Sequence, residues 1–252
     1  MNDGVRQALT ERLLAMADDE LILAHRNSEW AGHGPILEED IAFANIALDE
    51  MGHGSIWYGL RGELSGEDTD RLIFFRNAGL YRNVQLVEFP RGDWAFSMVR
   101  QYLFDAAENV TLAHLKASAY APLAEAAAKI ATEEAYHLRH TGLWLRRLGL
   151  GTEESHSRTK AALDRLWPYA HQLFVPLPGD AALVAAGIIP DLALLRREWE
   201  GRVRLYLAEC GLTITDEALP RRDISRTEHT EHLMALLAEM QSVARLDPEA
   251  EW

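Results

Sequence analysis

The sequence predicts an all-α protein built on a four-helix bundle, with additional helices on its C-terminal side. Apolar residues recur at intervals of three and four along four long segments, which is the spacing of one face of an α-helix. The pattern Glu-x-x-His occurs in the second and in the fourth of these segments, as Glu50–His53 and Glu134–His137. No segment shows the convincing apolar–polar alternation that is typical of a β-strand.

The composition argues against several classes of function. The 252-residue chain carries a formal net charge of −14, whereas a nucleic-acid-binding protein needs a basic surface. Its single cysteine, Cys210, excludes an internal disulfide framework and suits a reducing cytoplasm. No segment approaches the roughly 18 uncharged apolar residues of a membrane span, and the first residues lack the apolar run of a signal peptide. We therefore expect a cytoplasmic protein that neither crosses a membrane nor binds nucleic acid.

The first two bundle helices are expected over residues 3–31 and 37–63. Glu20 falls on the apolar stripe of the first helix, which is formed by Leu9, Leu13, Met16, Leu23 and Trp30. A carboxylate on such a stripe must be paired, protonated or bound to a metal, because burying it alone is costly. In the second helix, Glu50 and His53 share the apolar stripe.

Three glycines, Gly52, Gly54 and Gly59, lie inside the second helix. Each costs about 1 kcal/mol of helix propensity relative to alanine. We interpret them as positions where a neighbouring helix or a substrate approaches the backbone.

A crossover between two helix pairs is expected next. It comprises a short helix at 69–76 and an extended connection through Val84 to Pro90. The third bundle helix then begins near Asp93, a residue type that caps helix N-termini, and continues to about residue 118. Asp105 and Glu108 are three residues apart on this helix, so that either of them could face the bundle centre.

The fourth bundle helix is expected over residues 122–148, with Glu134 and His137 on its apolar stripe. Further helices are expected at 154–173, 179–186, 190–209 and 226–245. No low-complexity linker divides the chain. We therefore expect a single domain over residues 1–252, with the core bundle at about 3–149 and a helical extension at about 150–252.

Together the acidic and histidine residues of the four helices predict a metal centre. Two Glu-x-x-His pairs on facing helices, with one further carboxylate on each of the other two, are the pattern of dinuclear carboxylate bundles. The expected ligands are Glu20, Glu50, His53, Glu108, Glu134 and His137, with Asp105 as the alternative to Glu108. Asp49, Glu133 or Asp105 is expected to accept a hydrogen bond from a ligand histidine. Carboxylate and imidazole suit iron, and also manganese or zinc, so the spacing leaves the metal open.

Near the C-terminus, His229 and His232 are also three residues apart. They could bind a metal, but an apolar helical face follows them, formed by Leu233, Leu236, Leu237 and Met240. We interpret the segment as a capped C-terminal helix that docks on the bundle or on a partner.

Several stretches carry a resemblance to a known family: Glu29–Pro35, Ala44–Asp49, Arg100–Tyr102, Tyr136–Arg139, and His229–Leu233 followed by Leu237–Gln241. In order and spacing, from about residue 10 to Trp252, they resemble the C subunits of phenylacetyl-CoA 1,2-epoxidase (phenylacetate-CoA oxygenase). The resemblance implies a ferritin-like fold and an oligomeric complex. It also implies a structural role beside the homologous A subunit, which is a di-iron protein that epoxidises phenylacetyl-CoA with electrons from a reductase subunit.

The resemblance further implies a degenerate metal site, because C subunits are generally regarded as non-catalytic. In this sequence Glu20, Glu50, His53 and Glu108 are all present, so that the full ligand set looks intact. The expected cofactor is therefore a di-iron centre, with an absent or vestigial metal as the alternative. Two functional hypotheses follow: a structural partner of the A subunit, or a di-iron oxygenase or oxidase in its own right.

Overall fold

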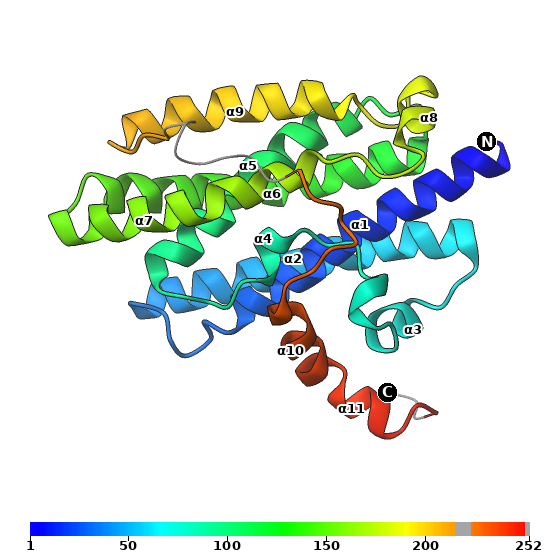
Figure 1. Cartoon of the computed structure of the whole chain (residues 1–252), viewed down its shortest axis with the longest axis horizontal. Helices are drawn as coiled ribbons and strands as arrows, with labels where there is room; N and C mark the ends of the chain where they lie inside the picture. The colour runs from blue at the N-terminus through cyan, green and yellow to red at the C-terminus, as the bar shows by residue number, and fades with distance from the viewer. Residues whose placement is uncertain (215–222, 250–252) are drawn as a thin grey trace.

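A computed structural model describes residues 1–214 and 223–249 of the chain (Figure 1). Every regular element in these two ranges is a helix, which confirms the all-α prediction. The four expected bundle segments form long helices: α1 (Asp3–Ser28), α2 (Leu37–Ser65), α5 (Trp94–Leu115) and α6 (Ala121–Gly149). The α1–α2 hairpin contacts the α5–α6 hairpin through α2 and α6.

Local sequence fixes where these helices begin and end. The Asn2 side chain accepts a hydrogen bond from the first turn of α1, and Asp93 does the same for α5, at 2.8 Å from the Phe96 amide. The predicted start near Asp93 is therefore confirmed. Helix α2 ends at Gly66, whose φ of 73° is a left-handed conformation that favours glycine.

The crossover between α2 and α5 is more helical than expected. It contains α3 (Thr69–Phe74), η1 (Ala78–Leu80) and α4 (Gln85–Glu88), so that the prediction of an extended connection through Val84 was wrong. Two buried side chains from elsewhere in the chain induce the last of these turns. Asp19 accepts a hydrogen bond from the Val84 amide, and Gln172 accepts one from the Gln85 amide, both at 2.7 Å.

A second layer of helices covers the α5–α6 hairpin on the side away from α1 and α2 (Figure 1). It consists of α7 (Glu153–Ala170), η2 (His171–Phe174) and α9 (Leu192–Glu209), whereas α8 (Asp180–Ala185) packs against α1, where Arg12 bonds to Asp180. Trp167 on α7 and Trp199 on α9 are buried and stacked, with ring centroids 4.8 Å apart. The largest hydrophobic core runs through this layer into α5.

The C-terminal helix is shorter than predicted and is split into α10 (Glu231–Met240) and α11 (Ser242–Leu246). Tertiary contacts hold the preceding residues 223–230 in a non-helical strap. Within this strap, buried Arg226 bonds to Asp19 at 2.7 Å, and the Thr230 amide bonds to Glu88 at 2.6 Å. The expected docking of the C-terminal helix on the bundle is confirmed by the burial of Leu233, Leu236 and Leu237.

His229 does not form a metal group with His232 in the described part of the chain. Its Nδ1 atom lies 2.7 Å from Glu88 Oε1, so this histidine holds the strap against α4 instead. None of the described helices is long and apolar enough to cross a membrane.

Of the three glycines in α2, one allows a close approach. A Cβ atom on Gly54 would lie 3.4 Å from the Glu20 side chain and from the backbone of Ala17, so α1 packs against this point. A Cβ atom on Gly52 or Gly59 would meet nothing within 4 Å among the described residues. The prediction that a neighbouring helix approaches the backbone at these two glycines was therefore wrong.

Candidate metal centre

The acidic and histidine side chains predicted from the sequence converge inside the bundle. Each bundle helix contributes, and each contributing residue is at most 2% exposed: Glu20 from α1, Glu50 and His53 from α2, Asp105 from α5, and Glu134 and His137 from α6. Five of them fall into two groups whose potential ligand atoms lie within 4.8 Å of one another, and Glu134 lies between the groups, with Oε1 3.3 Å from His53 Nδ1 and 3.0 Å from His137 Nδ1. The first group is Glu20, Glu50 and His53, and the second is Glu50, Asp105 and His137. Glu50 is common to both.

His53 directs its two ring nitrogens to different environments. Nε2 lies 2.8 Å from Oε2 of Glu133, a surface residue of α6. Nδ1 faces the bundle interior, 3.3 Å from Glu134 Oε1 and 4.0 Å from one oxygen each of Glu20 and Glu50. When Nε2 carries the proton that Glu133 accepts, Nδ1 presents a lone pair to these three carboxylates.

His137 is held at both ring nitrogens. Nε2 lies 3.2 Å from Asp49 Oδ2, and Nδ1 lies 3.0 Å from Glu134 Oε1. The side chains of Asp49 and Glu133 are 43% and 46% exposed, so a surface carboxylate orients each buried histidine from outside. The expectation that Asp49 and Glu133 accept hydrogen bonds from the two histidines is confirmed.

Asp105 and Glu108 occupy different positions, although both come from α5. Asp105 joins the second group and accepts a hydrogen bond from the Thr141 hydroxyl at 2.8 Å. Glu108 belongs to neither group and lines a small cavity of about 40 Å³ with Arg12, Asp19 and apolar side chains. Burial and the nearby Glu134 raise the pKa of Glu108 to about 8. The geometry therefore brings Asp105, rather than Glu108, to His137.

Gln101 is a member of the centre that sequence reasoning missed. It is fully buried on α5, one turn before Asp105. Its Nε2 donates to Glu50 Oε1 and to Asp105 Oδ1, both at 2.6 Å, and its Oε1 accepts from Asn27 at 2.7 Å. The only signal in the sequence was the i,i+4 spacing between Gln101 and Asp105.

The electrostatics of the centre follow from packing several acids in a dry interior. Burial and neighbouring carboxylates raise the pKa of Glu20 and of Asp105 well above their ordinary values. Burial also disfavours the charged form of Glu134, but bonding to the two histidines outweighs it and lowers this pKa to about 2. Although burial opposes their charge, the same contacts raise the pKa of His53 to about 9 and that of His137 to about 11.

Several potential ligand atoms of the centre make no well-formed hydrogen bond to any described residue, although His53 Nδ1 lies 3.3 Å from Glu134 Oε1. They are both oxygens of Glu20, Oε2 of Glu50, Oε2 of Glu134 and Nδ1 of His53. Buried polar atoms are normally hydrogen-bonded, and such exceptions call for a physical cause. A proton shared between the carboxylates of Glu20 and Glu50 is one way to satisfy them, and a cation is another. Carboxylate oxygens with one imidazole nitrogen fit a divalent iron or manganese ion. The buried acidic and histidine residues could therefore bind a metal.

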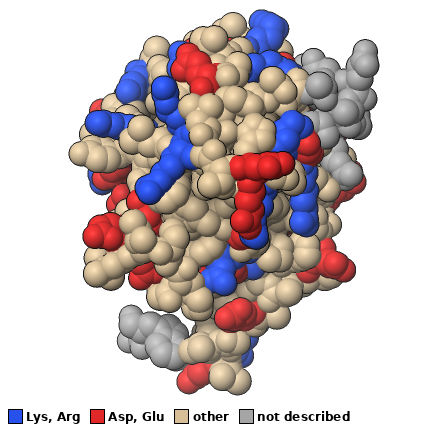
Figure 2. All heavy atoms as spheres, turned by 90° about the vertical axis from the view of Figure 1, so that its left-hand side faces the viewer, with Lys and Arg blue, Asp and Glu red and all other residues tan. Residues whose placement is uncertain are grey.

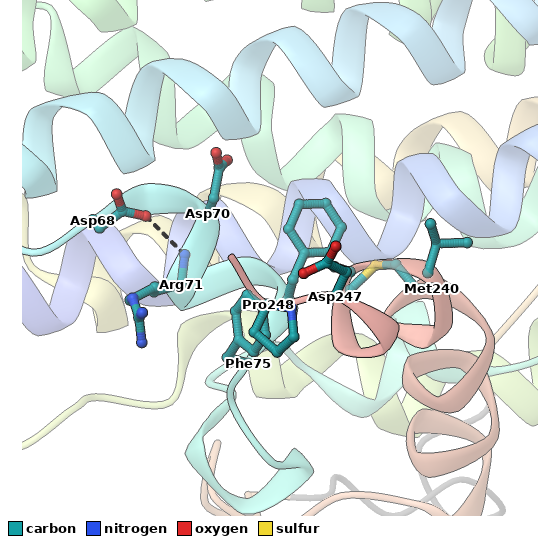
Figure 3. A pocket seen from close by; sticks show the side chains of 10 residues that line it. Asp68, Asp70, Arg71, Phe75, Met240, Asp247 and Pro248 are labelled. Carbon is teal, nitrogen blue, oxygen red and sulfur yellow. Dashed lines mark hydrogen bonds between the residues drawn. The ribbon is translucent and has the colours of Figure 1, made fainter. Parts of the chain in front are cut away.

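A larger pocket, of about 470 Å³, lies on the surface between α3 and α11 (Figure 3). Phe75, Met240 and Pro248 line it together with the acidic residues Asp68 and Asp247. Its lining residues do not come from α1, α2, α5 or α6, so this pocket lies apart from the carboxylate–histidine centre.

Fold and centre together define a helical-bundle protein with a buried carboxylate–histidine site. The chain belongs to the phenylacetic acid catabolic protein family, a ferritin-like all-α family whose sequence model matches residues 1–252. It is 39% identical over 245 residues to the C subunit of 1,2-phenylacetyl-CoA epoxidase from Escherichia coli (strain K12). This match covers 97% of the present chain and 99% of the relative. The A subunit of the same epoxidase is 26% identical over 176 residues, which are 70% of this chain and 57% of that one.

Proposed function

We propose that this chain is the C subunit of a 1,2-phenylacetyl-CoA epoxidase complex and acts as the structural partner of the catalytic di-iron A subunit. The observation that carries the proposal is the 39% identity to a C subunit over nearly the whole of both chains. The match to an A subunit is weaker, at 26% identity over 57% of that protein. On this proposal the complex also contains a reductase, binds phenylacetyl-CoA and works in the cytoplasm, with the present chain contributing one domain.

The surface of α2 supports a role as one component of a complex. Ile41, Leu48 and Met51 lie on one face of this helix and are 54%, 64% and 44% exposed. On neighbouring α6, Tyr136 is 76% exposed. Large exposed apolar side chains that share one face of a helix, as these three of α2 do, are typical of a protein–protein interface. By contrast, the face of the molecule in Figure 2 carries interspersed acidic and basic side chains, and nucleic acid is not expected as a partner.

Co-expression with a tagged A subunit tests the proposal. We expect the two chains to co-purify in equal amounts and to elute as one complex in size-exclusion chromatography. Leu48→Glu should weaken the complex, because it puts a charge on the apolar face of α2. Leu205→Glu is the matched control, since Leu205 is 67% exposed on distant α9. Failure of the wild-type chains to co-purify would overturn the proposal, and equal effects of both variants would rule out this face of α2.

The set of buried acids and histidines favours a second candidate function. Glu20, Glu50, His53, Glu134 and His137, together with Asp105 or Glu108, would hold iron, which when bound supplies dioxygen activation. The chain would then be a di-iron oxygenase or oxidase in its own right. Dioxygen consumption by the isolated chain, loaded with ferrous iron anaerobically and supplied with an electron donor, separates the two functions. The structural role predicts no consumption above the rate with unloaded protein.

A further inference from the structure

The donor atoms of the centre divide into two halves that differ in how they are satisfied. In the half formed by Glu20, Glu50 and His53, three carboxylate oxygens, both of Glu20 and Oε2 of Glu50, have no hydrogen bond from any described residue, and His53 Nδ1 makes only a 3.3 Å contact with Glu134 Oε1. Glu134 lies between the two halves: its Oε1 is 3.3 Å from His53 Nδ1 and 3.0 Å from His137 Nδ1, and its Oε2 has no hydrogen bond from any described residue. We call these four residues, Glu20, Glu50, His53 and Glu134, the cation seat.

The other half is satisfied by the protein itself. Glu50 Oε1 and Asp105 Oδ1 both accept from the Gln101 amide, and Asp105 Oδ2 accepts from Thr141. His137 is bonded through Nδ1 to Glu134 and through Nε2 to Asp49. Both oxygens of Asp105, both ring nitrogens of His137 and Oε1 of Glu50 therefore already have partners.

Gln101 takes the electrostatic place of an ion between Glu50 and Asp105. Its NH₂ group offers one hydrogen to each carboxylate, which offsets the repulsion between them as a bridging cation would. A metal ion bound there would have to break both hydrogen bonds. The amide would then be left buried without its two acceptors, and a buried donor without an acceptor is destabilising. The Asn27 side chain, 2.7 Å from Gln101 Oε1, keeps the amide in this orientation.

We infer that the centre is built for one divalent cation, bound at the cation seat, and that Gln101 closes the second position of what would otherwise be a dinuclear site. The seat offers three carboxylates and one imidazole, a donor set that suits Mn²⁺ or Fe²⁺. The inference concerns the chain alone and does not depend on whether it pairs with an A subunit.

Manganese binding to the purified full-length chain tests this inference. We expect one Mn²⁺ per chain by elemental analysis after removal of free ion, and the electron paramagnetic resonance spectrum of an isolated Mn²⁺. Gln101→Ala should bind two ions and show the spectrum of a coupled pair. The matched control is Gln241→Ala, which removes another buried glutamine. The side-chain amide of Gln241 donates to backbone carbonyls far from the centre. This control should still bind one ion.

Two histidine variants keep the test decisive if Gln101→Ala fails to fold. His53→Ala should abolish binding, because it removes the nitrogen of the seat. His137→Ala should still bind one ion, because His137 lies in the other half. Two ions, or none, in the folded wild-type chain would overturn the inference. A single ion in folded Gln101→Ala would overturn the role of Gln101, and equal loss in both histidine variants would overturn the division into halves.

Discussion

Replacing Glu133 by alanine probes the orientation of His53 without disturbing the core. Glu133 Oε2 lies 2.8 Å from His53 Nε2, and its side chain is 46% exposed. The variant leaves Nε2–H to bond to water, so the fold should tolerate it. The imidazole loses the carboxylate that fixes its tautomer and its ring. Removing such an outer carboxylate typically weakens metal affinity 10–100-fold, or about 1.4–2.7 kcal/mol.

Isothermal titration of the metal-free chain with Mn²⁺ measures this loss. Glu125→Ala is the control, because Glu125 is an exposed glutamate on the same helix. Asp49→Ala offers a sharper comparison, since Asp49 bonds to His137 in the other half of the centre. We expect the Mn²⁺ affinity of Glu125→Ala and that of Asp49→Ala to change by less than about threefold. Unchanged Mn²⁺ affinity in Glu133→Ala would refute His53 as a ligand. An equal loss of affinity in Asp49→Ala would refute the claim that His137 is not a ligand at the cation seat.

Three further results are expected. Arg226→Ala leaves a buried carboxylate on α1 without its partner, so it should cost about 3–5 kcal/mol in urea denaturation; a loss below about 1 kcal/mol would mean that the strap does not stabilise the fold. Gly59→Ala should stabilise α2 by up to about 1 kcal/mol, whereas Gly149→Ala should destabilise because its Cβ would overlap a backbone carbonyl at the end of α9; melting temperatures that move in the same direction would contradict this packing. The pKa values of about 9 for His53 and about 11 for His137 lie above the ordinary value near 6.5. The two protonated histidines therefore add their full contribution to the free energy of unfolding below about pH 6.5. This contribution is lost as the pH rises through 9 and 11. Thermal melts of the metal-free chain should therefore show stability falling above neutral pH by about 1.4 kcal/mol per pH unit for each proton involved, and a flat profile from pH 7 to 10 would contradict the histidine contacts.

The bundle was predictable because its information is local. Helical spacing located all four long helices, and the three-residue spacing in Glu50–His53 and Glu134–His137 put each pair on one face. These residues do converge in the structure, where Glu134 Oε1 lies within 3.3 Å of both His53 and His137.

What the sequence left open depends on contacts between distant residues. Asp105 and Glu108 could not be ranked from a three-residue spacing, because only the rotation of α5 against its neighbours decides which one meets His137. Gln101 was missed because glutamine is an ordinary helix residue until Glu50, 51 positions away, is placed beside it. The sequence predicted that a helix begins at residue 226, within the strap. The bond between His229 and Glu88, 141 positions apart, outweighs the local propensity for a helix there.

The most direct test of a single-cation centre is anomalous diffraction at the manganese absorption edge, from crystals grown with excess Mn²⁺. We expect one anomalous peak among Glu20, Glu50, His53 and Glu134, with Gln101 still bonded to Glu50 and Asp105. Two peaks about 3.5–4 Å apart, the separation of a dinuclear site, with Gln101 turned away from both carboxylates, would contradict it.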